Sequence, residues 1–197
     1  MRCLEPILIV LIACGGCSSG PHWKRQGFAF SMPADPPATN ASETITSLSR
    51  VSISPIFQSR SFTYRMAENS YEQDPYAGFL VPPERALAEP IRAWMRTSGA
   101  YGRVVEPGSG ITPNIIVEVS VTELYGDFRE AKQPKAVLAL RVVFANVGGG
   151  VILQKEYSRH LTIQKNTAAA VVAGWNQALG EIMGELASDL ASANQTH

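Results

Sequence analysis

Apolar residues recur at every second position in three stretches of the C-terminal half, which is the pattern of strands with one buried face. The stretches lie at 115–122, 136–144 and 151–163. A glycine run at 148–150 predicts a short turn between the last two, so we expect those strands to pair antiparallel. Three shorter alternating stretches predict further strands, at 28–32, 48–57 and 61–66. The second and third of these are close enough in sequence to pair as a hairpin.

Two other segments have apolar residues at helical spacing, and the first contains Leu87, Ile91, Trp94 and Met95. The pair Pro82-Pro83 suits the first turn of this helix, and Gly99 is a typical C-terminal stop. Pro90 lies inside this segment and is expected to kink the helix or to delay its regular part, because proline removes a backbone hydrogen bond.

A longer helix is predicted after an N-cap at Asn166 or Thr167. Its apolar stripe consists of Val171, Val172, Trp175, Ala178, Leu179, Ile182, Met183, Leu186 and Leu190. Gly180 and Gly184 are expected to offer a thin surface for close packing on a sheet. The order of elements predicts an α+β fold: a two-layer sandwich with two helices on one face of a mostly antiparallel sheet of about six strands.

The N-terminus has the pattern of a bacterial lipoprotein signal. A short apolar run at 7–13 is far below the length of a membrane-spanning helix but fits the core of a secretory signal. The run ends in Leu11-Ile12-Ala13-Cys14. The small side chain of Ala13 lets the signal peptidase close on the bond before Cys14, and the Cys14 thiol is expected to receive the lipid, with palmitate among its acyl chains. The alternative is an ordinary cleaved signal with a coincidental cysteine. We predict residues 1–13 as the signal peptide and Cys14 as the lipid attachment site.

Charge and cysteine content exclude several classes of protein. The chain has 17 basic and 17 acidic residues, which argues against a nucleic-acid binder and against docking on anionic lipid through a polybasic patch. Cys3 would leave with the signal and Cys14 would carry lipid, so only Cys17 would remain, free or modified. A single cysteine forms no internal disulfide, so burial must hold the fold together.

The remaining chain is expected to form one domain. Residues 14–26 are predicted to be a lipidated tether, followed by a single domain at 27–193 and a disordered tail at 194–197. The tether residues after Cys14 span roughly 20 Å as a coil and at most about 40 Å. No later apolar run approaches the length of a membrane span. We therefore expect a domain that is soluble apart from its anchor and stays near its membrane.

No residue pattern points to catalysis or to a metal site. His22 and His197 lie near the chain ends, and His160 is expected to point to solvent from its strand. The chain has no Cys-x-x-Cys or His-x-x-x-His pair, and Glu181 and Glu185 are expected on a solvated helix face. We predict neither an enzyme nor a metal or other cofactor beyond the covalent lipid.

Aromatic residues gather in one segment and alternate there with arginines. Its members are Arg60, Phe62, Tyr64, Arg65, Tyr71, Tyr76 and Phe79. One interpretation is that they cover an edge of the sheet and pack under a loop. The other is a partner-binding surface, since Tyr, Phe and Arg are enriched at interfaces. Spacing does not separate the two interpretations, and both can hold.

This segment, together with three other runs, resembles the ABC-type transport auxiliary lipoproteins. The other runs are Phe28-Ala29-Phe30-Ser31-Met32-Pro33, Val51-Ser52-Ile53-Ser54-Pro55 and Ile91-Arg92-Ala93-Trp94-Met95. Members of that family serve transporters that move phospholipid or other lipid between envelope membranes. They work beside a permease, an ATPase and a substrate-binding protein of the mammalian-cell-entry type.

The resemblance implies a periplasm-facing, non-enzymatic accessory subunit that docks on such a partner. Gly15 and Gly16 follow the predicted lipidated cysteine, with no aspartate there to retain it in the inner membrane, so outer-membrane attachment is expected. The alternative function is a periplasmic carrier of lipid or of another hydrophobic ligand, with a cavity between the sheet and the helices.

Overall fold

The computed structural model describes residues 24–32 and 43–194. Cys14 and most of the predicted tether lie outside the described residues. The elements are β1 (Gln26–Phe28), β2 (Ile45–Ile53), a 3₁₀ turn η1 (Pro55–Phe57), β3 (Ser61–Ala67), β4 (Ser70–Phe79), α1 (Pro83–Ser98), β5 (Arg103–Val105), β6 (Ile115–Asp127), β7 (Lys135–Asn146), β8 (Val151–Thr162) and α2 (Ala168–Asn194). Gln26, expected as the last residue of the tether, is thus the first residue of β1.

The strands form one open mixed sheet of eight, so the expected number of about six was too low. The long ladder β7–β8 is antiparallel, as predicted from the glycine turn, and the ladder β6–β7 is antiparallel as well. The additional strands are β4 and the short β5, which pairs parallel with β2. Parallel pairing also joins β1 to β4 and both β2 and β3 to β6.

The predicted hairpin between 48–57 and 61–66 was wrong. β2 ends at Ile53, and Pro55 begins η1, which carries the chain away before β3 starts. β6 is long enough to pair with β2 along its first half and with β3 at its far end, so the two strands follow one another along one edge. The hairpin partner of β3 is instead β4, which lacks a hydrophobic alternation and was not predicted as a strand.

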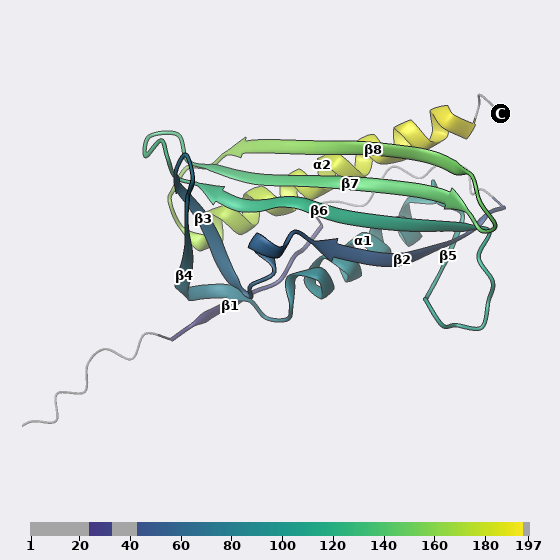
Figure 1. Ribbon diagram of the computed structural model, residues 1–197, viewed down its shortest axis with the longest axis horizontal. Helices are drawn as coiled ribbons and strands as arrows, with labels where there is room; N and C mark the ends of the chain where they lie inside the picture. Colours follow the sequence, from purple (N-terminus) through teal and green to yellow (C-terminus); the bar gives the residue numbers. More distant parts are fainter. Residues whose placement is uncertain (1–23, 33–42, 195–197) are drawn as a thin grey trace, which may run out of the picture.

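Both helices lie on the same face of the sheet, as predicted (Figure 1). α1 packs on β2 and β5, whereas α2 packs on β7 and β8. α1 begins at Pro83 and ends before Gly99, whose left-handed φ of 68° provides the C-terminal stop. Pro90 lies inside α1, and the helix is nevertheless continuous.

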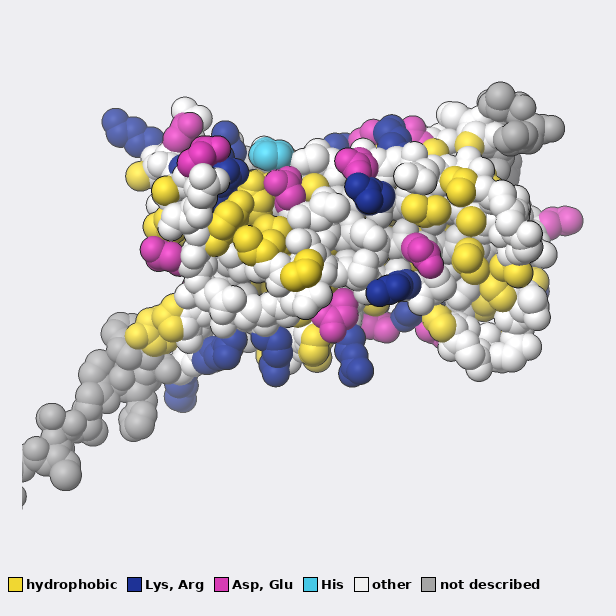
Figure 2. Space-filling view, viewed as in Figure 1, with side chains coloured by type: hydrophobic (Ala, Val, Ile, Leu, Met, Phe, Trp, Pro, Cys, Tyr) yellow, Lys and Arg dark blue, Asp and Glu magenta, His cyan; other side chains and the backbone are white. Residues whose placement is uncertain are grey.

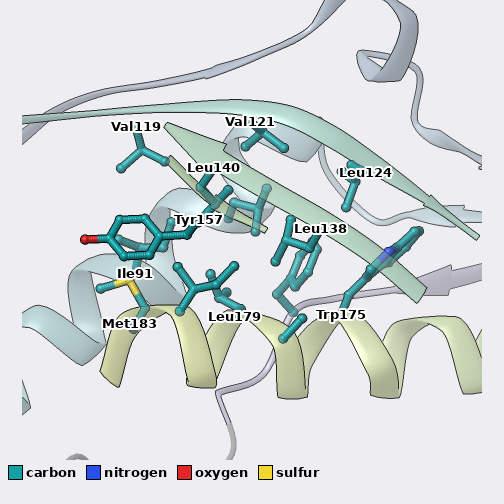
Figure 3. Close-up of a cluster of buried hydrophobic side chains, with 14 of the residues drawn as sticks. Ile91, Val119, Val121, Leu124, Leu138, Leu140, Tyr157, Trp175, Leu179 and Met183 are labelled. Carbon is teal, nitrogen blue, oxygen red and sulfur yellow. The ribbon is translucent and has the colours of Figure 1, made fainter. Parts of the chain in front are cut away.

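The core fills the layer between the sheet and the helices (Figure 3). Leu138 and Leu140 of β7 face Leu179 and Met183 of α2, and all four side chains are buried. Trp175 is fully buried, and its indole N–H donates to the carbonyl oxygens of residues 137 and 125, at 3.0 and 3.3 Å. This indole therefore joins α2 to the two central strands by packing and by hydrogen bonding.

A glycine that permits close packing of α2 is Gly174, which was not among the predicted ones. A Cβ added at Gly174 would lie 2.5 Å from the Cβ of Ala136, so only glycine lets the helix approach β7 this closely. A Cβ added at Gly184 would meet nothing within 4 Å. The expectation that Gly184 packs on the sheet was wrong, because the helix turns that residue away from β7.

Ion pairs join the C-terminal half of α2 to β8. Arg159 pairs with Glu185 at 2.5 Å and with Glu181 at 3.2 Å. Lys155 pairs with Asp189 at 2.7 Å and with Glu185 at 3.0 Å. The Arg159 guanidinium lowers the pKa of Glu185, and the Lys155 ammonium lowers the pKa of Asp189. The acidic residues expected on a solvated face thus help to attach the helix to the sheet.

Replacing the two glycines by alanine should change stability in opposite directions. Gly174→Ala should lower the free energy of unfolding by ~1–3 kcal/mol, because the added methyl group forces the helix away from Ala136. Gly184→Ala, the matched control in the same helix, should raise it by ~0.5–1 kcal/mol through helix propensity. Urea unfolding measures both values. A stable Gly174→Ala variant would show that the close approach to β7 is not needed.

The ion pairs predict a loss of stability in acid. Because folding lowers the pKa of Glu185 and Asp189, their contribution is present above the unfolded values and is lost as pH falls through the folded values, below about pH 4. Between neutral pH and pH 3, the melting temperature of the Glu185→Gln/Asp189→Asn variant should therefore fall less than that of the parent protein. Glu43→Gln/Glu72→Gln, which removes two exposed acids without an ion pair among the described residues, should follow the parent protein.

Candidate partner-binding surface

Two residues of the predicted aromatic surface belong to the core instead. Phe62 and Phe79 are buried, and their rings contact each other with centroids 4.7 Å apart. Both rings also lie against Trp175, at 5.1 and 5.8 Å. In this conformation they offer no surface to a partner, and their role is to join the β3–β4 hairpin to α2.

Arg65 and Tyr71, two other members of the predicted surface, lie on the opposite face of the sheet, which no described helix covers. We call this the outer face; it is the face turned toward the viewer in Figure 2. The Arg65 guanidinium lies over the ring of Tyr71, at 5.8 Å from its centroid. Tyr71 in turn contacts Phe57 and Tyr125 with its ring edge, at 6.2 and 5.7 Å. Together these four residues form the outer aromatic cluster.

The sequence analysis missed Phe57 and Tyr125 as members of this cluster. A β-bulge between Val121 and Glu123 shifts the alternation of β6, so Tyr125 turns to the outer face although the earlier odd-numbered residues of β6 face the core. Phe57 reaches the cluster from η1, and its ring stacks on Tyr125 at 5.7 Å. Burial raises the pKa of the Tyr125 phenol, and a hydrogen bond with Arg65 opposes part of that increase.

The remaining predicted residues lie at the edge of the hairpin. The Tyr64 hydroxyl donates to Asp74 at 2.8 Å. Burial raises the pKa of Tyr64, and the hydrogen bond to the Asp74 carboxylate raises it further. Arg60 donates to the carbonyl oxygens of Phe79 and Leu80, so its guanidinium holds the end of β4. Tyr76 is half exposed, at 50 % of its surface.

Beyond the cluster the outer face forms a shallow depression of about 410 Å³. Its lining includes the small side chains of Thr122, Ala139 and Ser158. Arg141 and Glu156 flank it and pair with each other at 2.6 Å. Figure 2 shows hydrophobic side chains toward both ends of this face, with mainly small, polar and charged ones along its middle. Such a surface suits a flat protein contact better than an enclosed ligand.

A second pocket, of about 300 Å³, lies beside the end of β6 and is charged. Arg129 donates to both carboxylate oxygens of Asp127, at 2.7 and 3.0 Å, and also pairs with Glu68 at 3.0 Å. The guanidinium lowers the pKa of Asp127. Because these charges satisfy one another, the pocket leaves little unbalanced charge for a ligand.

The described residues contain no group of three or more His, Cys, Asp or Glu side chains placed to hold a metal ion. His160 is exposed on the outer face of β8, as predicted from the alternation. Within residues 24–32 and 43–194, no helix is both long and apolar enough to cross a membrane. Phe57 and Tyr125 are buried, so only Arg65 and Tyr71 of the outer aromatic cluster are partly exposed. The candidate contact surface therefore consists of these two side chains and the depression on the outer face.

Comparison with known proteins gave a family and a fold. The family model described as "ABC-type transport auxiliary lipoprotein component" matches residues 28–187. The crystal structure of protein XCC0632 from Xanthomonas campestris, assigned to family DUF330, is 18% identical and superposes with a TM-score of 0.74, covering 87% of this chain and 98% of that one. The crystal structure of an uncharacterized protein is 12% identical, with a TM-score of 0.64 over 80% of this chain and 99% of that one. Among curated proteins, none matches the chain.

Two substitutions should separate core residues from surface residues within the predicted aromatic set. Phe62→Ala should lower the free energy of unfolding by ~3–5 kcal/mol, because it leaves a cavity against Trp175. Tyr76→Ala should lower it by less than ~1 kcal/mol, because that side chain is half exposed. Urea unfolding gives both values, and similar losses for the two variants would contradict this division.

Proposed function

Because the chain belongs to the ABC-type transport auxiliary lipoprotein family, we propose that it is the lipid-anchored, non-enzymatic accessory subunit of an ABC-type transporter that moves lipid. The family match over residues 28–187 carries this proposal. The choice of lipid as the transported molecule follows from the resemblance described above. The expected partner is a substrate-binding protein of the mammalian-cell-entry type.

The anchor is the lipid on Cys14, and the protein faces the periplasm from the outer membrane. Several acyl chains on one residue make a stable attachment, because each buried CH₂ contributes about 0.8 kcal/mol. The domain begins at Gln26, so the tether keeps it within about 40 Å of the anchored residue. At that distance it meets transporter components that come close to the same membrane.

The outer face is the surface that we propose for docking. Both helices cover the other face, and the layer between them and the sheet is filled with buried side chains (Figure 3). This filled layer favours docking over the alternative of a carrier with an internal cavity. Of the predicted partner-binding residues, Arg65 and Tyr71 lie in the outer aromatic cluster, and Tyr76 is exposed.

Affinity purification tests the proposed role. The full-length lipidated protein, extracted from its native membranes in a mild detergent, should retain a permease, an ATPase and a mammalian-cell-entry-type protein, identified by mass spectrometry. Recovery of the protein with lipid on Cys14 but without any transporter component would count against the proposal.

A charged substitution on the outer face should weaken that association. Ser158 is exposed and lines the depression, so Ser158→Arg should reduce recovery of the transporter components about tenfold or more, because it places an unpaired charge in the contact. Ser188→Arg introduces the same residue on the exposed side of α2 and should leave recovery unchanged. Both variants should keep the melting temperature of the parent. Equal recovery with both would move the docking surface elsewhere.

A further inference from the structure

One corner of the molecule combines exposed apolar side chains with basic ones, next to the point where the described chain begins. Leu80 and Val81, between β4 and α1, expose 58% and 45% of their surfaces. Arg25, just before β1, and Arg60, just before β3, come to this segment through hydrogen bonds to Ser61 and to the carbonyl oxygen of Leu80. Lys24 precedes Arg25, and Arg85 follows Val81 in the first turn of α1; both are exposed. We call the following residues the basic corner: Lys24, Arg25, Arg60, Leu80, Val81 and Arg85.

Backbone and side-chain contacts hold this corner together. The Leu80 amide donates to the carbonyl oxygen of Phe28 at 3.0 Å, and the Leu80 side chain lies across Gly27, where an added Cβ would meet it at 2.2 Å. Arg60 donates to the carbonyl oxygen of Leu80, and Arg25 donates to the Ser61 hydroxyl at 2.9 Å. The segment before α1 is thus fixed against β1, the strand nearest the proposed anchor.

Within the described part of the chain, the basic residues of the corner have no acidic partners. Among the described residues, the ion pairs lie elsewhere in the molecule and none includes Lys24, Arg25, Arg60 or Arg85. Asp74 of the neighbouring β4 accepts hydrogen bonds from Tyr64 and from two backbone N–H groups. Glu84 lines a depression with Arg50. Figure 2 shows Lys and Arg side chains along the lower edge, next to the place where the described chain begins.

We propose that the basic corner lies against the anionic phospholipid headgroups of the leaflet that holds the Cys14 lipid. The inference rests on the lipid anchor of the proposed function. Lys24 is ten positions after Cys14, which limits their distance to about 35 Å and makes this corner the part of the domain nearest the anchor along the chain. Basic residues bind phosphate groups, and exposed apolar residues enter the interface, so both components of the corner fit this surface.

This contact would orient the domain. The turn between β7 and β8 lies at the opposite end of the sheet from β1 (Figure 1). With the corner on the membrane, that end of the sheet points away from the bilayer and leaves the outer face open to a partner. The orientation distinguishes this arrangement from a domain that tumbles freely on its tether.

Lipid quenching of a fluorophore tests the contact. The lipidated full-length protein, in a Cys17→Ser background, carries a fluorophore at Val81→Cys or, as control, at Val151→Cys, a position 61% exposed beside the distant β7–β8 turn. Vesicles contain nitroxide-labelled lipid in phosphatidylcholine alone or mixed with phosphatidylglycerol. We expect strong quenching at position 81 with phosphatidylglycerol, little with phosphatidylcholine alone, and little at position 151 with either lipid.

Variants that lack basic residues of the corner provide a second test by the same quenching experiment. Lys24→Gln/Arg85→Gln should lower the ratio of docked to undocked protein about fivefold for each charge. Lys132→Gln/Lys165→Gln, which removes two exposed charges outside the corner, should leave quenching unchanged. Equal quenching in both lipids, at both positions or after both double substitutions would overturn the proposal. So would quenching at position 81 that needs an added transporter component, which would mark the corner as a protein contact.

Flotation of the same samples separates this inference from the proposed function. Protein that fails to float with the vesicles lacks the anchor, and the proposed function fails with it. Protein that floats but shows no quenching at position 81 keeps the anchor and overturns only the membrane contact of the corner.

Discussion

The structure depends on burying the apolar stripe of α2 against the antiparallel strands β6, β7 and β8. Trp175 is central to this contact, because its ring packs on the aromatic side chains of the β3–β4 hairpin while its N–H joins the two central strands. Gly174 lets the helix approach β7 closely enough for the indole to reach those carbonyl groups. The hairpin, the helix and the central sheet are therefore stabilised as one unit, without any disulfide among the described residues.

Because both helices pack on one face of the sheet, the outer face is left without a helix among the described residues. The length of β6 lets β2 and β3 share one of its edges, and η1 between them brings Phe57 onto the outer face beside Tyr125. One end of the outer face thus holds an aromatic cluster in which Phe57 and Tyr125 are buried, and the depression beyond it is lined by small side chains and by the Arg141–Glu156 ion pair. This face is the one that we propose for docking.

Charged residues are also distributed unevenly over the described part of the molecule. The chain has equal numbers of basic and acidic residues, and on that ground a polybasic membrane patch was not expected. The fold, however, uses many acidic residues to pair with arginines and lysines along β8, α1 and the end of β6. Basic residues at the start of the described chain are left without such partners. A chain without net charge can therefore present a positive corner at the end of the domain that follows the proposed anchor.

Local patterns were sufficient to predict both helices, the antiparallel pairing of β7 with β8 and the exposure of His160, because each depends on residues close together in sequence. The family was identified from a resemblance that extends over most of the domain. The lipid site at Cys14 remains a prediction from the signal pattern alone. Tertiary structure decided the partners of β2 and β3, since strand pairing depends on which edge of β6 is available. It also decided which aromatic residues face the helices. Phe62 and Tyr71 belong to the same aromatic segment of the sequence, but Phe62 contacts Trp175 in the core, whereas Tyr71 contacts Tyr125 on the outer face. The bulge in β6 and the hairpin register set those faces, and neither leaves a signal in the hydrophobic pattern.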